Sequence, residues 1–148
     1  MKFSGSVSLH GQLHILVKDE ENNIKHDLTV PNLVVDAGLA FIASRMAGTS
    51  SSVMSHMAVG SSSTAASSGQ TDLVSILGSR VSLTSGTAST NTMTYIATFG
   101  AGVSTGAITE AGVFNASSSG TMLCRSVFST INKAAGDSMT ITWTITLS

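Results

Sequence analysis

The last eleven residues of the chain alternate apolar and hydroxyl-bearing side chains without a break. The apolar positions of residues 138–148 are Met139, Ile141, Trp143, Ile145 and Leu147. Because successive side chains of a β-strand point to opposite faces, this alternation predicts a strand with one buried and one solvent-facing side. The end of the chain therefore indicates a structural framework and not a reaction centre.

The same alternation occurs twice near the start of the chain. Residues 4–18 and 24–30 alternate in this way, and the polar cluster 19–23 separates them. They predict a β-hairpin that ends at Pro31, because proline has no amide hydrogen to donate to a ladder. Gly11 interrupts the first segment and predicts a bulge there.

Shorter alternations predict further strands along the rest of the chain. They fall at residues 54–59, 80–83, 93–99, 108–114 and 122–128, and turns are expected around Gly86, over 100–102, over 115–120 and over 133–137. Seven or more short strands with turns at short intervals are typical of an all-β fold. We expect an antiparallel β-sandwich, jelly-roll-like, in which Tyr95, Phe99, Phe114, Phe128 and Trp143 belong to the core.

One segment has a helical period instead. Within residues 36–47 the apolar positions spaced i, i+3, i+4 and i+7 are Leu39, Ile42, Ala43 and Met46. This spacing predicts one short helix whose apolar stripe packs on a sheet. Asp36 is expected to cap its start, and Gly48 is available to end it.

Residues 60–70 consist mainly of Ser, Gly and Ala, a composition that predicts a flexible loop. Loops of this length are often mobile or contact a partner. This loop and the segment before the first strand are therefore our candidate contact elements.

Size and charge limit the possible functions. A chain of 148 residues predicts a single domain, residues 1–148, and seven Lys and Arg against eight Asp and Glu give a net charge of −1. Without a basic cluster a nucleic-acid partner is not expected, and no segment approaches the ~20 apolar residues of a membrane span. The lone Cys124 lies within an apolar alternation, so we interpret it as a core residue of a protein made in a reducing cytosol.

The sequence contains only weak signals for a catalytic or metal-binding site. Residues 102–106 match the G-x-S-x-G pattern around Ser104, but no helix pattern follows, so we interpret Ser104 as a turn serine. His10 and His14 are four residues apart on a predicted strand, about 13 Å, which is too far for two ligands of one metal ion. Neither a catalytic residue, a metal ligand nor a cofactor is expected, and we do not expect an enzyme.

Glu110 is the one acidic residue in an otherwise apolar segment, residues 107–115. A buried carboxylate needs a partner, and Arg125 and Arg80 are available in or beside neighbouring predicted strands. We therefore expect a structural pair of Glu110 with one of these arginines, which would fix the register of two strands. Simple exposure of Glu110 and a role as an acid catalyst are the alternatives.

Several blocks of the sequence together resemble small virion proteins of tailed bacteriophages. The blocks are residues 32–38, 56–60, 71–73, 108–115, 122–125 and 137–143, which read NLVVDAG, HMAVG, TDL, ITEAGVFN, MLCR and DSMTITW. The resemblance spans most of the chain and implies no catalytic residues. It implies a capsid cement or decoration protein that binds the outer shell, bridges neighbouring capsid subunits and contacts copies of itself.

The same resemblance also includes proteins labelled as tail-fibre components. A tail or fibre component, including a host-attachment module, is therefore the alternative function. Fibres usually carry heptads or repeats that build a shaft, and this chain has none, which favours the capsid surface. The expected partners are the major capsid protein and further copies of the chain, and the expected location is the capsid surface of the virion after synthesis in the host cytoplasm.

Overall fold

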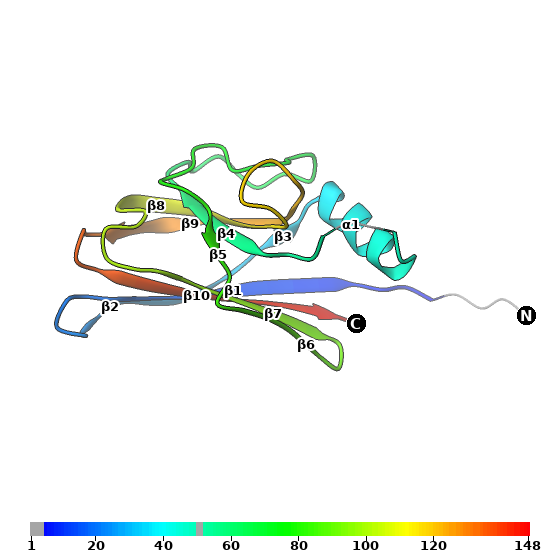
Figure 1. Cartoon of the computed structure of the whole chain (residues 1–148), viewed down its shortest axis with the longest axis horizontal. Helices are drawn as coiled ribbons and strands as arrows, with labels where there is room; N and C mark the ends of the chain where they lie inside the picture. Colours follow the sequence, from blue (N-terminus) through cyan, green and yellow to red (C-terminus); the bar gives the residue numbers. More distant parts are fainter. Residues whose placement is uncertain (1–4, 50–51) are drawn as a thin grey trace, which may run out of the picture.

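The computed structural model describes residues 5–49 and 52–148, which form two facing antiparallel sheets and one helix (Figure 1). Sheet 1 has the strand order β2 (Ile24–Pro31), β1 (Leu9–Lys18), β10 (Ser138–Leu147), β7 (Thr92–Phe99) and β6 (Ser85–Ser89). Sheet 2 has the order β3 (Leu33–Val34), β9 (Met122–Lys133), β8 (Gly106–Phe114), β4 (His56–Gly60) and β5 (Val81–Ser82). The predicted all-β sandwich with one short helix is confirmed.

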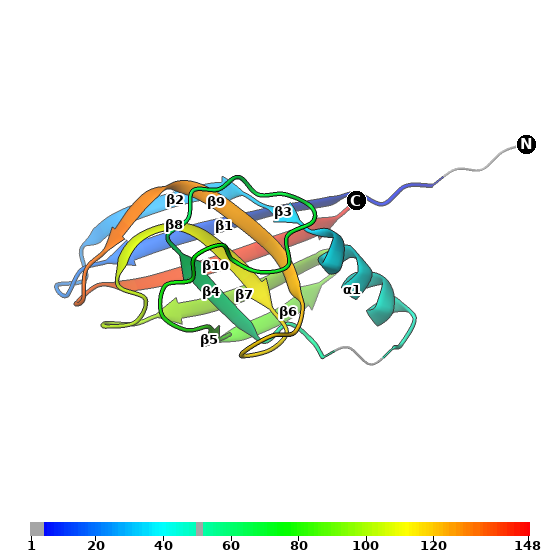
Figure 2. The ribbon, with the colours of Figure 1, turned by 90° about the horizontal axis from the view of Figure 1, so that it is seen from above.

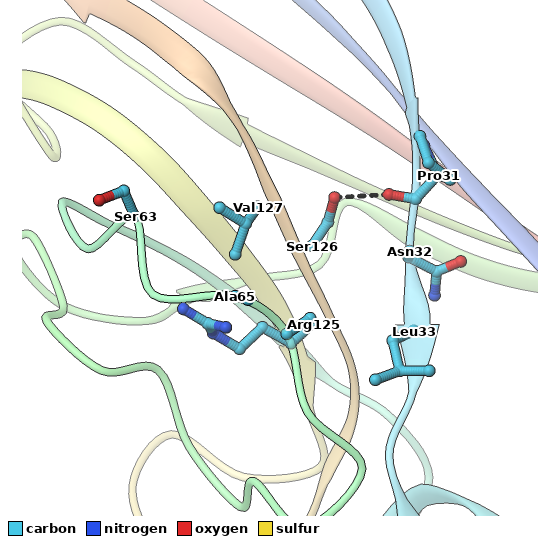
Figure 3. A pocket seen from close by; sticks show the side chains of 9 residues that line it. Pro31, Asn32, Leu33, Ser63, Ala65, Arg125, Ser126 and Val127 are labelled. Carbon is cyan, nitrogen blue, oxygen red and sulfur yellow. Dashed lines mark hydrogen bonds between the residues drawn. The ribbon is translucent and has the colours of Figure 1, made fainter.

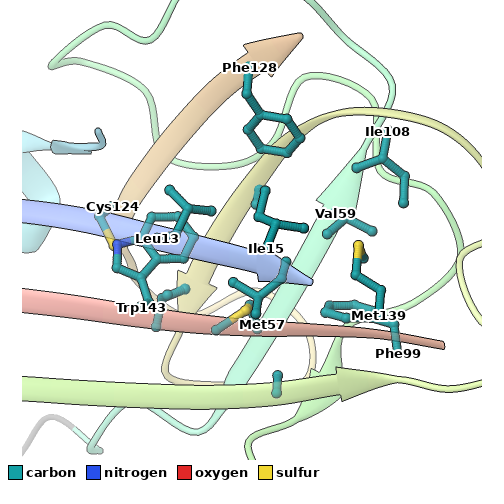
Figure 4. Close-up of a cluster of buried hydrophobic side chains, with 14 of the residues drawn as sticks. Leu13, Ile15, Met57, Val59, Phe99, Ile108, Cys124, Phe128, Met139 and Trp143 are labelled. Carbon is teal, nitrogen blue, oxygen red and sulfur yellow. The ribbon is translucent and has the colours of Figure 1, made fainter. Parts of the chain in front are cut away.

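The terminal strand β10 is the central strand of sheet 1, between β1 and β7. Its predicted apolar face points into the sandwich, where Met139, Ile141, Trp143 and Ile145 are fully buried, while the threonines between them lie on the outer face. Figure 4 shows side chains of both sheets meeting in this core. Burying one large apolar side chain contributes roughly 1.5–3 kcal/mol, so this layer is the main source of stability.

A second, smaller apolar cluster lies on the outer face of sheet 2. Its buried members are Val35, Ala58, Leu73, Phe114 and Met122. Of the aromatic residues expected in the core, Phe114 is thus buried on the opposite side of the sheet from Trp143, Phe99 and Phe128, and Tyr95 is only partly buried. The outer cluster exists because the loop after β4 covers this face.

The strands differ from the sequence expectation at several places. Residues 85–89, which we took as the turn region of Gly86, form the edge strand β6. The sequence did not predict this strand because its small, hydroxyl-rich side chains show no apolar alternation. Strand β9 continues to Lys133 and not to residue 128. Gly11 pairs in register with Ile145 and is no bulge between these strands; a Cβ there would collide with the amide of Asn32.

The first strand was expected from Ser4, which lies outside the described residues; the strand itself begins at Leu9. The hairpin of β1 and β2 and its end at Pro31 are as predicted. Its turn is fastened by the carboxylate of Asp19, which accepts hydrogen bonds from the backbone amides of Glu21 and Asn23, both at 2.9 Å.

Helix α1 (Asp36–Met46) occupies the predicted residues, but of the predicted stripe only Ile42 packs against the core. Its buried residues are Gly38 and Phe41, whereas Leu39 and Met46 of the predicted stripe are 47% and 84% exposed. The reason is Gly38, whose missing side chain lets the helix lie directly on the Leu123 carbonyl of β9; a Cβ there would collide with that carbonyl. The position before the helix is Val35, so Asp36 lies in the first turn and makes no side-chain cap bond.

Residues 61–80 form a long irregular segment that lies over the outer face of sheet 2 (Figures 1 and 2). We call it the covering loop. It makes one bridge back to the sheet, between Ile76 and Gly60, and Leu73 inserts into the outer apolar cluster. Sheet 2 is therefore buried on both faces, in contrast to sheet 1.

Candidate functional site

Glu110 and Arg125 form an ion pair under the covering loop. They project from the neighbouring strands β8 and β9, and both side chains are fully buried. The Arg125 Nε donates to Glu110 Oε2 at 2.9 Å, and Nη2 lies 2.7 Å from the same oxygen without a second hydrogen bond. A buried pair of this kind stabilises a fold only where further hydrogen bonds satisfy both groups.

The covering loop supplies those hydrogen bonds to Glu110. The backbone amides of Val74 and Ser75 donate to its carboxylate at 3.1 and 2.7 Å, and that of Ser62 at 3.4 Å. Gly60 makes room for this arrangement, since a Cβ there would collide with Glu110. The carboxylate thus anchors the loop at two points of its length.

Arg125 holds the same loop through its other nitrogen. Its Nη1 donates to the Thr64 carbonyl at 2.9 Å and to the Gln70 side-chain oxygen at 3.0 Å. Within residues 60–70, which we predicted to form a flexible loop, the structure shows hydrogen bonds of the backbone and of Gln70 with the buried pair.

Arg80, the third predicted pairing candidate, does not contact Glu110. Its guanidinium lies 3.7 Å over the ring of Phe114, and its Nη1 donates to the carbonyls of Ala116 and Ser119 at 2.9 and 2.7 Å. It also lies 3.5 Å from the Asp72 carboxylate. Arg80 therefore fastens the end of the covering loop to the β8–β9 turn, while Glu110 and Arg125 fasten its start and middle.

A cleft of about 440 Å³ opens where the covering loop meets the β2–β3 connection (Figure 3). Its lining includes Pro31, Leu33, Ala65 and Val127, and at its base Ser126 donates to the Pro31 carbonyl at 2.7 Å. The charge of Arg125 is directed to Glu110 and to the loop. The cleft consequently offers shape and apolar contact and little charge.

Ser104 lies in the turn between β7 and β8 with φ 51°, and its buried hydroxyl makes no hydrogen bond within the described structure. Of the histidines considered as metal ligands, His14 lies 2.6 Å from Asp27, whereas His10 is exposed. Over residues 5–49 and 52–148 the structure brings together no group of three or more His, Cys, Asp or Glu. Ser104 therefore has the position of a turn residue.

A charged cluster that sequence reasoning missed lies at the far end of the sandwich. The Asp137 carboxylate accepts hydrogen bonds from Lys25 Nζ and, at 2.8 Å, from the Ala134 amide, and together with the nearby Lys133 these hold the pKa of Asp137 below its usual range. Burial lowers the pKa of Lys133, which donates to the Gly100 carbonyl at 2.8 Å. Lys25 and Asp137 are too distant in sequence for a spacing rule to relate them.

Cys124 is a free, fully buried thiol, and burial raises its pKa. Burial also raises the pKa of Tyr95, with a smaller contribution from Cys124. Both groups therefore stay protonated at neutral pH, as expected of core residues.

Comparisons of the chain with protein-family models, with curated proteins and with solved structures found no match. None of the helices in the described residues is long and apolar enough to cross a membrane. The geometry defines a class of protein, a β-sandwich with a loop fixed over the outer face of one sheet. The outer surface of this loop is the candidate functional site.

Proposed function

We propose that this protein is a structural component of a tailed-bacteriophage particle, a capsid cement protein that binds the outer shell and bridges neighbouring capsid subunits. The observation that carries the proposal is the covering loop, which buried charges fix on the outside of sheet 2. In this proposal it is the contact surface, the partners are the major capsid protein and copies of the chain, and the role is structural and not catalytic.

The covering loop has the properties of a preformed binding surface. Its backbone is already ordered, so docking costs less conformational entropy than docking of a free loop. Val74 and Ile76 point outward and are 52% and 45% exposed, while Asp72 is the only charged residue between 61 and 79. Such a surface suits contact with another protein better than recognition of a charged small ligand.

The residues that carry the resemblance to virion proteins converge on this same region. Val35, Ala58, Leu73, Phe114 and Met122, each from a different block, form the outer apolar cluster, and Glu110 and Arg125 lie beside it. Only the block at residues 137–143 lies in sheet 1. Most of the blocks that carry the resemblance thus contribute to the cluster that supports the covering loop. This is the arrangement expected if proteins with these blocks bind their partner through the same surface.

A shell presents many equivalent sites, so contacts that are individually weak sum to a large effect on the particle. The sandwich provides a rigid body for this purpose, since both of its sheets contribute to one apolar core. A near-neutral chain also avoids self-repulsion when many copies are bound close together.

The alternative, a tail component or host-attachment module, has less support in the geometry. A glycan-binding head is expected to expose aromatic rings for stacking. The single Trp143 is fully buried, and Tyr95 faces the interior of the sandwich.

The proposal is tested by the number of copies per purified virion, measured by quantitative mass spectrometry against the major shell protein. We expect a number close to that of the shell protein. A handful of copies would assign the protein to the tail, and its absence from virions would overturn the proposal.

The contact surface is tested separately, by adding purified protein to particles that lack it. Ile76→Asp places a charge on the exposed covering loop, and we expect it to weaken binding to the shell at least tenfold. Thr98→Asp is the matched control, because Thr98 is exposed on the outer face of sheet 1. Equal binding of both variants would exclude the covering loop as the contact surface.

A further inference from the structure

We propose that two copies of this chain associate by strand addition, with residues 1–7 of one copy pairing along the open edge of β6 in another. This self-association goes beyond binding to a shell and can be measured on the purified protein alone. It rests on three features: an unprotected sheet edge, an apolar groove beside that edge, and an N-terminal segment whose sequence continues the alternation of β1.

The first feature is the edge of sheet 1 at β6. This strand is hydrogen-bonded to β7 on one side only, and its sequence, Ser-Gly-Thr-Ala-Ser, contains neither a charge nor a proline. The opposite edge, β2, carries Lys25, Asp27 and Pro31. Charges and prolines are the usual protection of sheet edges against further strands, so β6 is the edge open to pairing.

The second feature is a groove of about 560 Å³ between this edge and helix α1. Its lining includes Phe41, Met46, Val53, Ala88, Met93 and Tyr95. Ala88 and Met93 are paired neighbours on the inner face of sheet 1. A strand added beside β6 would extend this face, and every second side chain of that strand would enter the groove.

The third feature is the segment before β1. Residues 1–9 continue the alternation of that strand, with Met1, Phe3, Val7 and Leu9 at odd positions and Lys or Ser at even ones. Among the described residues 5–8, the backbone pairing within the sandwich ends at Ser8, which exchanges hydrogen bonds of 2.6 and 2.9 Å with Ser148. Val7 is 75% exposed, so its apolar side chain is not buried within its own copy.

The occupant of the groove is a second copy because residues 5–8 of the chain itself lead away from the groove. In Figure 2 the blue residues before β1 run on past the end of the sheet, away from both layers. The strands β10 and β7 lie between β1 and β6, a separation of about 14 Å. The seven residues before Ser8 span about 23 Å when extended, enough to leave one sandwich and pair along the five residues of β6 in the next.

The test is the association of the full-length chain, measured by sedimentation velocity over a range of concentrations. We expect Ala88→Glu, which puts a charge at the groove, and Val7→Asp, which puts one on the inserting face, each to weaken association at least tenfold. Thr98→Glu is the matched control, because Thr98 lies on the outer face of the inner strand β7, away from the groove, and this variant should leave association unchanged. Ala88, Val7 and Thr98 are all exposed, so the sandwich itself tolerates the changes.

A disulfide identifies the pairing directly. A Val7→Cys protein mixed with an Ala88→Cys protein should form a crosslinked dimer under mild oxidation, whereas Val7→Cys mixed with Thr87→Cys should not. The native Cys124 is buried and does not compete. A wild-type chain that stays monomeric at every concentration, association that Ala88→Glu leaves intact, or a crosslink independent of the cysteine position would each overturn the proposal.

Discussion

The side-chain amide of Asn32 accepts a hydrogen bond from the indole Nε1 of Trp143 at 3.1 Å when its oxygen is turned toward the ring. In the same orientation its nitrogen donates to the Gly11 carbonyl at 2.7 Å. Asn32 lies where the chain passes from β2 in sheet 1 to β3 in sheet 2, and Trp143 is at the centre of β10. One amide thus satisfies a buried indole and fixes the crossover between the sheets.

We predict that Asn32→Ala destabilises the fold by about 1–3 kcal/mol, because it leaves the buried Trp143 N–H without an acceptor. Gly11→Ala should have a similar effect, since its Cβ would displace the Asn32 amide. Urea unfolding followed by tryptophan fluorescence measures both. Gly69→Ala is the control, because no atom lies within 4 Å of the added Cβ; equal stability of the Gly11 and Gly69 variants would contradict the role of Asn32.

Removing one member of the buried ion pair should be more harmful. We predict that Glu110→Ala lowers the free energy of unfolding by about 3–5 kcal/mol, because it leaves Arg125 as an uncompensated buried charge. The amides of Val74 and Ser75 lose their acceptor in the same variant, so their hydrogen exchange should accelerate more than that of β10.

Two further variants sharpen this prediction. Exchanging Glu110 and Arg125 is not expected to restore stability, since a guanidinium offers no acceptor to the loop amides. Asp27→Asn is the control: Asp27 pairs with His14 at the surface, where such pairs contribute about 0–1 kcal/mol. If Glu110→Ala proves as mild as Asp27→Asn, the pair does not anchor the loop.

The Glu110–Arg125 contact illustrates how far sequence reasoning reaches. A carboxylate inside an apolar segment requires a partner, and the apolar strand 122–128 offered Arg125, so the contact could be expected before the structure. The third group in the arrangement is backbone, the amides of Val74 and Ser75, and backbone amides leave no mark in a sequence. The anchoring of the loop was therefore unpredictable although the pair was not.

Strand alternation predicted the sheets well because one face of each long strand is buried against the same core. It failed for β6, whose residues face solvent or an open groove and need no apolar period. It also failed for the orientation of α1, where a missing side chain at Gly38 outweighs the apolar stripe by allowing contact with the Leu123 backbone. Close backbone approach depends on tertiary geometry and has no periodic signature.

The orientation of the helix gives a direct prediction. Phe41→Ala should cost about 3–5 kcal/mol, the range for removing a buried aromatic side chain, whereas Leu39→Ala should change stability by less than about 0.5 kcal/mol. The pair is well matched, since both are large apolar residues of one helix and differ in burial, 9% against 47% exposed. Thermal and urea unfolding distinguish the two variants, and the reverse order would mean that the stripe of Leu39 and Met46 is the packed face.

The last prediction concerns pH. Asp137 has a pKa held below its ordinary 3.8, first by the hydrogen bond from Lys25 and then by the Ala134 amide. A carboxyl group whose pKa is lower in the folded than in the unfolded state binds its proton more weakly when folded. Its contribution to stability is therefore fully present above about pH 5 and is lost as the pH falls through the folded-state pKa.

Asp137→Asn removes this contribution, so the difference in unfolding free energy between wild type and variant should be largest at pH 7 and shrink as the pH falls below about 4. Urea unfolding at pH 7, 5 and 3 measures it. Asp36→Asn is the control: Asp36 is exposed in the first turn of α1. A constant difference for Asp137→Asn across the three pH values would show that the carboxylate charge contributes nothing and that Asp137 acts only through its shape and neutral hydrogen bonds.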